Sequence, residues 1–221
     1  MKYLLALGTL LIILSCGKEK VIQLPEISHS KITEINDVSP AYLFYDETKP
    51  DSIELNRKNL ISTTNWLVNV DKRLTLKQVI PHIKYLQDKK LNSSHKNKAA
   101  KNYFTCNDTS KKNLGFIEFT DVVYHQKEGL NVDSDLNHNN LLVFSLDSIT
   151  IVTHDNKIFN AEKESVIITL RDSLTLSNKK DIFYCSFEKK LTFQDYITFK
   201  SELSDLNLKD VLIADDEFIF N

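Results

Sequence analysis

The stretch Asp71-Lys72-Arg73-Leu74-Thr75-Leu76 has a second copy in Glu188-Lys189-Lys190-Leu191-Thr192-Phe193. Both copies run in the order acid, base, base, Leu, Thr, apolar residue. Each follows a strand-like run, at residues 66–70 and 182–187, and each precedes a segment whose apolar residues recur at helical spacing. The two stretches therefore predict two strand-turn-helix units, and we place the other elements around them.

The same positions carry the signals that begin a helix. Thr75 and Thr192 are suited to cap the first free amides, while Gln78 and Asp195 lie three residues later, where a capping box needs them. Pro81 should kink the first helix or delay its start, because it lacks a backbone donor. The residues that form the expected hydrophobic staples and apolar faces are Leu74, Val79, Ile83 and Leu86 in the first unit and Leu191, Tyr196, Phe199, Leu203 and Leu206 in the second.

The likeness of the two units extends over about 20 residues each, which leaves two explanations open. One is an internal duplication that gives two related halves, at about residues 32–130 and 131–221. The other is independent convergence, because Leu-Thr before a helix is favourable chemistry in any strand-turn-helix unit.

Short alternating segments elsewhere predict further strands. They lie at residues 42–45, 52–56, 116–124, 141–146, 148–153, 166–170, 211–214 and 218–220, with a turn at residues 214–217 between the last two. Strands outnumber helices and lack regular helical crossovers, so we expect an α+β fold with a mainly antiparallel sheet and two or three helices.

Residues 87–113 are polar and rich in lysine, and we expect a solvated loop or an exposed helix there. A patch for an anionic ligand is the alternative. The lysines are Lys89, Lys90, Lys96, Lys98, Lys101, Lys111 and Lys112.

The N-terminus has the pattern of an export signal. Lys2 precedes an apolar run from Leu4 to Leu14, which is about half the roughly 20 residues that span a bilayer. The end of this run and the two residues after it, Ile13-Leu14-Ser15-Cys16, resemble the lipobox of bacterial lipoproteins. The resemblance implies cleavage before Cys16 and acylation of that cysteine with fatty acids that include palmitate. We expect a signal peptide at 1–15, a lipidated tether at 16–31 and a single body at 32–221.

Two further resemblances concern location and fold. The run from Ile13 to Cys16 with the charged tether Lys18-Glu19-Lys20 is similar to uncharacterised outer-membrane lipoproteins of Bacteroidetes, which implies a periplasmic or cell-surface address. The order strand, charged turn, Leu-Thr, helix resembles the periplasmic domain of the ExbD and TolR family. That family keeps a membrane helix with an acidic residue, which this apolar run lacks, so its energy-transducing role is not carried over.

Composition excludes several classes of function. The formal net charge of −2 gives no bulk basicity, so we expect no nucleic-acid partner. Only Gly115 and Gly129 of the four glycines lie in the body, too few for a phosphate-binding loop, a dinucleotide fingerprint or a nucleophile elbow. We expect no cofactor.

Cys106 and Cys185 are the thiols that remain once Cys16 is acylated. In an exported chain they are either joined in a disulfide or present as two buried, unpaired thiols, and both alternatives stay open. Asp133-Ser134-Asp135-Leu136-Asn137 begins like a calcium loop, but His138 stands in place of the turn glycine and Phe144 in place of the bidentate glutamate, so a polar loop is the better interpretation.

The histidines give little reason to expect a metal. His125, His138 and His154, with Asp147 and Asp155, could share one only if the strands bring them together, so no metal site is predicted.

Two functions compete. The first is a non-catalytic envelope lipoprotein, attached to the membrane by its lipid, that binds a protein or glycan partner or has a structural role. The second is an outer-membrane hydrolase that uses acids and histidines such as Asp133, Asp135 and His138. The sequence assigns no catalytic residue and leaves open whether the chain is an enzyme.

Overall fold

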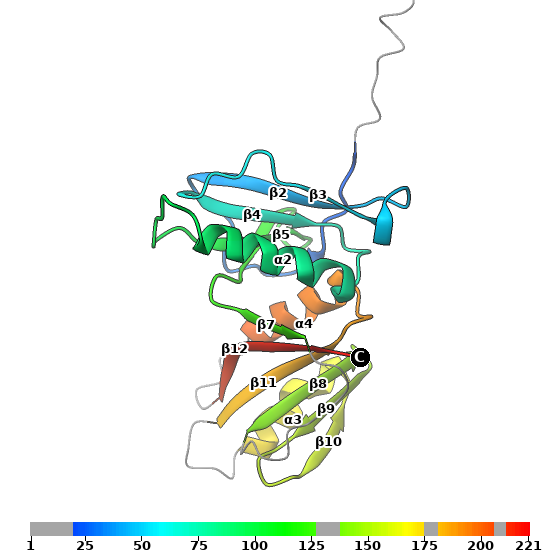
Figure 1. The fold of residues 1–221 in the computed structure, drawn as a ribbon. Helices are drawn as coiled ribbons and strands as arrows, with labels where there is room; N and C mark the ends of the chain where they lie inside the picture. The colour runs from blue at the N-terminus through cyan, green and yellow to red at the C-terminus, as the bar shows by residue number, and fades with distance from the viewer. Residues whose placement is uncertain (1–19, 127–137, 175–180, 206–210) are drawn as a thin grey trace, which may run out of the picture.

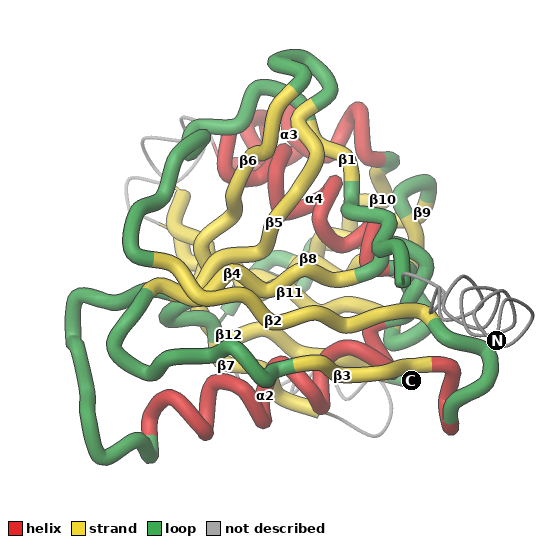
Figure 2. The backbone as a smooth tube through the Cα atoms, turned by 90° about the horizontal axis from the view of Figure 1, so that it is seen from above, coloured by secondary structure: helices red, strands yellow, loops and turns green. Residues whose placement is uncertain are grey.

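The computed structural model describes residues 20–126, 138–174, 181–205 and 211–221. Within these ranges the chain forms two six-stranded sheets, one above the other, with the helix α4 (Phe193–Asp205) where they meet (Figure 1). Seen from above, α2 (Leu76–Leu91) runs along one side of the molecule and α3 (Lys163–Leu174) lies on the other (Figure 2). None of the helices in these ranges is long and apolar enough to cross a bilayer.

The first sheet has the strand order β1-β5-β4-β2-β3, with β6 also paired to β5. Its helix α2 connects the parallel strands β4 and β5, and a short 3-10 turn at Pro50–Ser52 precedes β3. The strands are β1 (Glu26–Ile27), β2 (Val38–Tyr45), β3 (Ile53–Asn56), β4 (Asn65–Val70), β5 (Asn102–Asp108) and β6 (Asn113–Glu118).

The second sheet has the order β10-β9-β8-β11-β12-β7. Its helix α4 connects the parallel strands β11 and β12, and α3 leads from β10 into β11. The strands are β7 (Val123–Gln126), β8 (Asn139–Ser145), β9 (Ser148–Val152), β10 (Ile158–Ala161), β11 (Asp181–Glu188) and β12 (Val211–Phe220).

Four strands and one helix of each sheet share a topology. The order β3-β2-β4-β5 in the first sheet matches β9-β8-β11-β12 in the second. In both, the outer pair is antiparallel and the next two pairings are parallel. The helices α2 and α4 occupy equivalent crossovers, so the two strand-turn-helix units extend to a larger common framework.

The two similar stretches also contact each other. Thr75 and Thr192 form an antiparallel bridge. The Leu76 N–H donates to the Leu191 carbonyl at 2.9 Å, and the Phe193 N–H donates to the Leu74 carbonyl at 2.6 Å. Exchanging the two units converts one of these bonds into the other, as at the two-fold axis of a homodimer.

A second pair of hydrogen bonds is related by the same exchange of the two units. The Lys77 N–H donates to the Lys189 carbonyl at 2.8 Å, and the Gln194 N–H donates to the Lys72 carbonyl at 3.1 Å. The helix starts therefore join the units as well as beginning the helices.

The expected apolar faces of the two helices are buried. Val79, Ile83 and Leu86 on α2 and Tyr196, Phe199 and Leu203 on α4 all belong to one hydrophobic core that continues through both sheets. Leu206 lies outside the described residues. The helical expectation for both units is confirmed, and α2 continues through Pro81.

The expectation of a mainly antiparallel sheet is wrong, because both sheets are mixed. Of the ten strand pairings in the described chain, six are parallel and four antiparallel. Parallel neighbours need long connections. The helices α2 and α4 supply two of them, and chain segments that lack a helical pattern supply others.

Four local expectations also fail in whole or in part. The predicted strand at residues 116–124 is divided between the end of β6 and the start of β7, which lie in different sheets. Residues 166–170 lie in α3 and not in a strand, and residues 214–217 continue through β12 without a turn. The polar segment 87–113 is a helix end and a loop, mostly exposed, through residue 99, as expected, but it continues into β5, in which Tyr103, Phe104 and Cys106 are buried.

The structure attaches residues 20–31 to the body, although we expected them in the tether. The Pro25 carbonyl accepts from the Asn107 N–H at 2.8 Å, and β1 pairs with β5. Lys20 forms ion pairs with Asp46 at 3.0 Å and with Glu54. Residues 16–19 lie outside the described residues.

Candidate ligand-binding pocket

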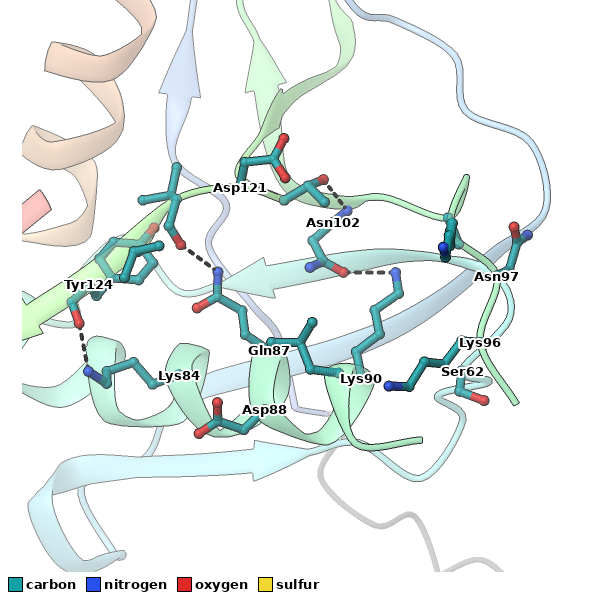
Figure 3. A pocket seen from close by; sticks show the side chains of 16 residues that line it. Ser62, Lys84, Gln87, Asp88, Lys90, Lys96, Asn97, Asn102, Asp121 and Tyr124 are labelled. Carbon is teal, nitrogen blue, oxygen red and sulfur yellow. Dashed lines mark hydrogen bonds between the residues drawn. The ribbon is translucent and has the colours of Figure 1, made fainter. Parts of the chain in front are cut away.

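A pocket of about 370 Å³ opens beside the C-terminal half of α2 (Figure 3). The loop after α2 and the segment between β6 and β7 form its other walls. Its lining residues are Ser62, Lys84, Gln87, Asp88, Lys90, Leu91, Lys96, Asn97, Lys98, Ala100, Asn102, Thr120, Asp121, Val122, Val123 and Tyr124.

Hydrogen bonds fix the segment 119–124 against α2. Gln87 Nε2 donates to the Val122 carbonyl at 2.8 Å, and Lys84 Nζ donates to the Tyr124 carbonyl at 2.6 Å. Both donors lie on the same side of α2, because they are three residues apart. This wall therefore connects the first sheet to the strand β7 of the second.

The opposite wall is the loop of residues 92–101, which is fixed to the segment before β4. Asn97 Nδ2 donates to the Thr63 carbonyl at 2.9 Å, and Ser62 Oγ donates to the His95 carbonyl at 3.1 Å. The pocket is thus framed before any ligand enters, which reduces the entropy lost on binding.

Two hydrogen bonds and one ring contact hold the Lys90 ammonium group in this pocket. Its Nζ donates to Asn102 Oδ1 at 2.9 Å and to the Lys101 carbonyl at 3.0 Å, and it lies 5.0 Å from the centre of the Trp66 ring. Asn102 is itself buried and donates its N–H to Thr120 Oγ1 at 3.0 Å. All three partners of the Lys90 ammonium group are neutral.

Burial without a counter-charge changes the acidity of this lysine. Desolvation lowers the pKa of Lys90 to about 8, because removing water disfavours the charged form. The neighbouring Lys101 shows the opposite case. Its hydrogen bond to Glu118 raises its pKa above the ordinary value.

The pocket combines positive charge with an apolar surface. Four lysines, Lys84, Lys90, Lys96 and Lys98, face two acids, Asp88 and Asp121, in its lining. Leu91, Ala100, Val122 and Val123 provide the apolar part, and the first and last of these are 66% and 49% exposed. The site is therefore suited to a molecule that has both an anionic group and an apolar body.

Three of the seven lysines named in the sequence, Lys90, Lys96 and Lys98, line this pocket. Trp66 and the segment 119–124 were missed as parts of the site. Neither carries a local signal, because tertiary packing brings them to α2.

The histidines do not converge. His125 Nε2 lies 2.6 Å from Asp216 Oδ1, His138 packs beside the ring of Tyr184, and the His154 N–H donates to Asn139 Oδ1 at 2.9 Å. Asp155 pairs with Lys157 at 2.8 Å, and Asp147 is exposed. Among the described residues, no group of three or more metal-binding side chains occurs. The segment Asp133 to Asn137 lies outside them.

Cys106 and Cys185 are free, buried thiols, which is the second of the two alternatives given above. Cys106 lies on β5 of the first sheet and Cys185 on β11 of the second. Burial raises the pKa of both thiols, that of Cys185 to about 12, so neither is a ready nucleophile. The predicted lipid-attachment residue Cys16 lies outside the described residues.

A buried polar network lies behind the pocket wall, and the sequence did not reveal it. The Tyr124 and Tyr196 hydroxyls are 3.1 Å apart, and the Tyr196 hydroxyl donates to Glu217 Oε2 at 2.8 Å. Lys200 Nζ forms an ion pair with Glu217, whose side chain is fully buried. Burial would lower the pKa of Lys200, but the Glu217 carboxylate outweighs it and the pKa is raised.

Comparison of the chain with family models, with curated proteins and with solved structures finds no match. The function is therefore argued from the chain's own residues.

Proposed function

We propose that this chain is a non-catalytic binding protein of the bacterial cell envelope, anchored to a membrane by a lipid on Cys16, and that the pocket beside α2 is its binding site. The pocket is the observation that carries the proposal. It is concave, already framed by hydrogen bonds, and combines apolar surface with polar groups that converge, as ligand sites do.

The lining residues favour binding over hydrolysis. The serine and threonine hydroxyls in the lining are engaged elsewhere, because Ser62 Oγ donates to the His95 carbonyl and Thr120 Oγ1 accepts from the Asn102 N–H. Neither bond pairs a nucleophile with a general base, which covalent hydrolysis needs. Of the residues named for the alternative hydrolase, His138 packs on Tyr184 away from this pocket, and Asp133 and Asp135 lie outside the described residues.

The lipid anchor would hold the body close to the membrane. Lys20 is bound to the first sheet through Asp46 and Glu54, so only the links from residue 16 to residue 20 could separate the anchor from the body. At about 3.5 Å for each residue, that distance is at most about 14 Å. A ligand or partner would therefore be bound next to the bilayer.

Metabolic labelling tests the anchor. A bacterium that expresses the full chain should incorporate labelled palmitate into it, and the protein should partition into detergent. Cys16→Ser should abolish both properties. A wild-type protein that takes up no label would contradict the lipid anchor without affecting the pocket.

Native mass spectrometry of protein extracted from its own membrane tests the pocket. Ala100 is buried in the pocket lining, whereas its neighbour Ala99 is exposed and outside it. The wild type and Ala99→Phe should retain a bound molecule, and Ala100→Phe should lose it because the phenyl ring fills the pocket. Retention by Ala100→Phe, with an unchanged far-UV spectrum, would place the bound molecule elsewhere.

A further inference from the structure

The geometry points to a ligand class: we infer that the pocket binds a small amphipathic anion, whose carboxylate or phosphate group pairs with the Lys90 ammonium and whose apolar part lies on Ala100 and Val122. This inference rests on the proposed binding function and specifies its ligand.

The first step is the missing counter-charge. Lys90 is half-buried, and its Nζ contacts two carbonyl-type oxygens and the face of Trp66. Each of these stabilises a cation, but none carries a negative charge. An anion that enters the pocket would complete the pairing, because a charge-assisted hydrogen bond is stronger than a neutral one.

The second step is the charge and polarity around Lys90. Lys96 and Lys98 line the same pocket, and in Figure 3 the Lys96 side chain extends from the loop toward Lys90. The acids Asp88 and Asp121 are exposed. The lining as a whole contains four lysines and two acids, so its net charge is positive.

The third step is the apolar lining, which distinguishes this site from one for a bare inorganic ion. Ala100 and Val122 are each 8% exposed and lie in the pocket wall, and Leu91 and Val123 extend the apolar surface outward. Burial of a short aliphatic chain on these residues would strengthen binding with each methylene group that leaves water. A ligand with both an anionic group and an apolar part should therefore bind more tightly than a ligand with only one of them.

The chain contains its own probe for this event. Trp66 is the single tryptophan, it is buried, and the Lys90 ammonium lies over its ring. An anion that engages Lys90 should change the Trp66 fluorescence. The full chain in phosphatidylcholine nanodiscs can be titrated with hexanoate, with the neutral analogue hexanamide, and with acetate, which has the charge without the body.

We expect hexanoate to bind at least tenfold more tightly than hexanamide or acetate, with a saturable change in fluorescence. Lys90→Met should weaken hexanoate binding about tenfold or more, measured by calorimetry because the substitution also alters the surroundings of Trp66. Lys89→Met is the matched control, since Lys89 is the adjacent exposed residue on α2 and does not line the pocket. It should bind hexanoate as the wild type does.

The pH dependence separates a bound anion from a structural role of Lys90. Only the protonated amine pairs with an anion, so affinity should be constant near pH 7 and fall as pH rises through about 8, by up to about tenfold at pH 9. Lys90→Arg should still bind hexanoate but lose this pH dependence, because arginine stays charged.

A free amphiphile and an acidic lipid share the proposed chemistry, and nanodisc composition distinguishes them. If the natural source is a lipid in the bilayer, phosphatidylglycerol nanodiscs should weaken hexanoate binding by competition. If it is a free molecule, affinity should be the same in both nanodiscs.

Equal binding of hexanamide and hexanoate, unaffected by Lys90→Met, would overturn the inference and leave a neutral-ligand pocket, consistent with the proposed function. Absence of hexanoate binding would also overturn it. In that case, the native mass spectrometry of Ala99→Phe and Ala100→Phe would still decide whether the pocket has a ligand at all.

Discussion

The two halves of this chain share a framework but use different chemistry where the helix meets the sheet. Ile83 on α2 and Lys200 on α4 are each the seventh residue after the apolar residue that ends the Leu-Thr stretch. Val79 and Tyr196 are likewise equivalent. Phe104 is the sheet partner of Val68, and Glu217 is the partner of the equivalent residue Cys185. An apolar trio in the first unit thus corresponds to Tyr, Lys and Glu in the second.

The same backbone can thus be completed by apolar packing or by a buried ion pair. The apolar trio needs no specific partner, whereas Lys200 and Glu217 depend on each other because an unpaired buried charge is costly. The cation without a counter-charge is instead found on the helix of the unit that has the apolar trio. The pocket lies beside α2, and a lysine at its wall has only neutral partners.

The largest expected effect is from breaking the ion pair. Lys200→Met should lower the free energy of unfolding by about 3–5 kcal/mol, since it leaves the Glu217 carboxylate buried without its cation. The matched change Ile83→Met should cost less than about 1.5 kcal/mol, because it keeps an apolar side chain of similar volume. Urea unfolding measures both.

The double variant Lys200→Met with Glu217→Gln sharpens this comparison. It should be more stable than Lys200→Met alone, because the uncompensated charge has been removed. If Lys200→Met is as mild as Ile83→Met, the two units do not differ in the way described here.

The two units should also respond to opposite extremes of pH. In the first, burial would raise the pKa of Asp71, but its hydrogen bonds with Arg73 outweigh this and lower the pKa below 3.8; the pKa of Asp108 is also lowered, by bonds from Ser30. The stability that these carboxylates provide is present above about pH 3.8 and should be lost as pH falls through their folded-state pKa values.

In the second sheet and its helix α4, burial raises the pKa of Tyr124 and Tyr196 well above 10.0, and the pKa of Lys200 is raised above 10.5. Stability should therefore hold below about pH 10 and fall above it, when the unfolded chain releases these protons first. Hydrogen exchange should show residues 65–71 and 102–108 opening first in acid and residues 193–204 and 211–220 opening first in alkali. Simultaneous opening of both units at both extremes would contradict this.

The smallest expected effect concerns the helix starts. Thr192 Oγ1 accepts from the Asp195 N–H at 3.1 Å, so Thr192→Ala should cost about 1 kcal/mol. The Thr75 hydroxyl instead donates to Gln78 Oε1 at 2.9 Å, and the Thr75 N–H donates to the same oxygen at 2.8 Å. Thr75→Ala leaves the second bond in place and should cost less, and thermal unfolding would reveal a reversed order.

The helix starts could be predicted from sequence because their chemistry is local: a threonine cap, a partner three residues later and an apolar face. The sheet pairing could not. The parallel pairing of β2 with β4 depends on a connection without an α-helix, and that of β8 with β11 on a connection whose helix, α3, has the sequence of a strand. Residues 166–170 have the β-branched composition of a strand, yet Val166 and Leu170 are four residues apart and bury one face of α3.

The buried network shows a second limit of the sequence. The acidic run at 215–217 has the composition of a turn, but Glu217 is buried because Lys200 and Tyr196 on another element satisfy it. The lysine-rich segment marked one wall of the pocket, whereas Trp66 and the residues around Val122 come from elsewhere in the chain. A local pattern identifies the charges but not what they face.

Hydrogen exchange of the full chain with and without hexanoate tests most directly whether the ligand binds beside α2, with α4 as the internal control. We expect slower exchange in residues 84–102 and 119–124, no change in residues 193–204, and much less slowing in Lys90→Met at a hexanoate concentration that half-saturates the wild type. Equal slowing in both helices, or a change confined to α4, would contradict binding beside α2.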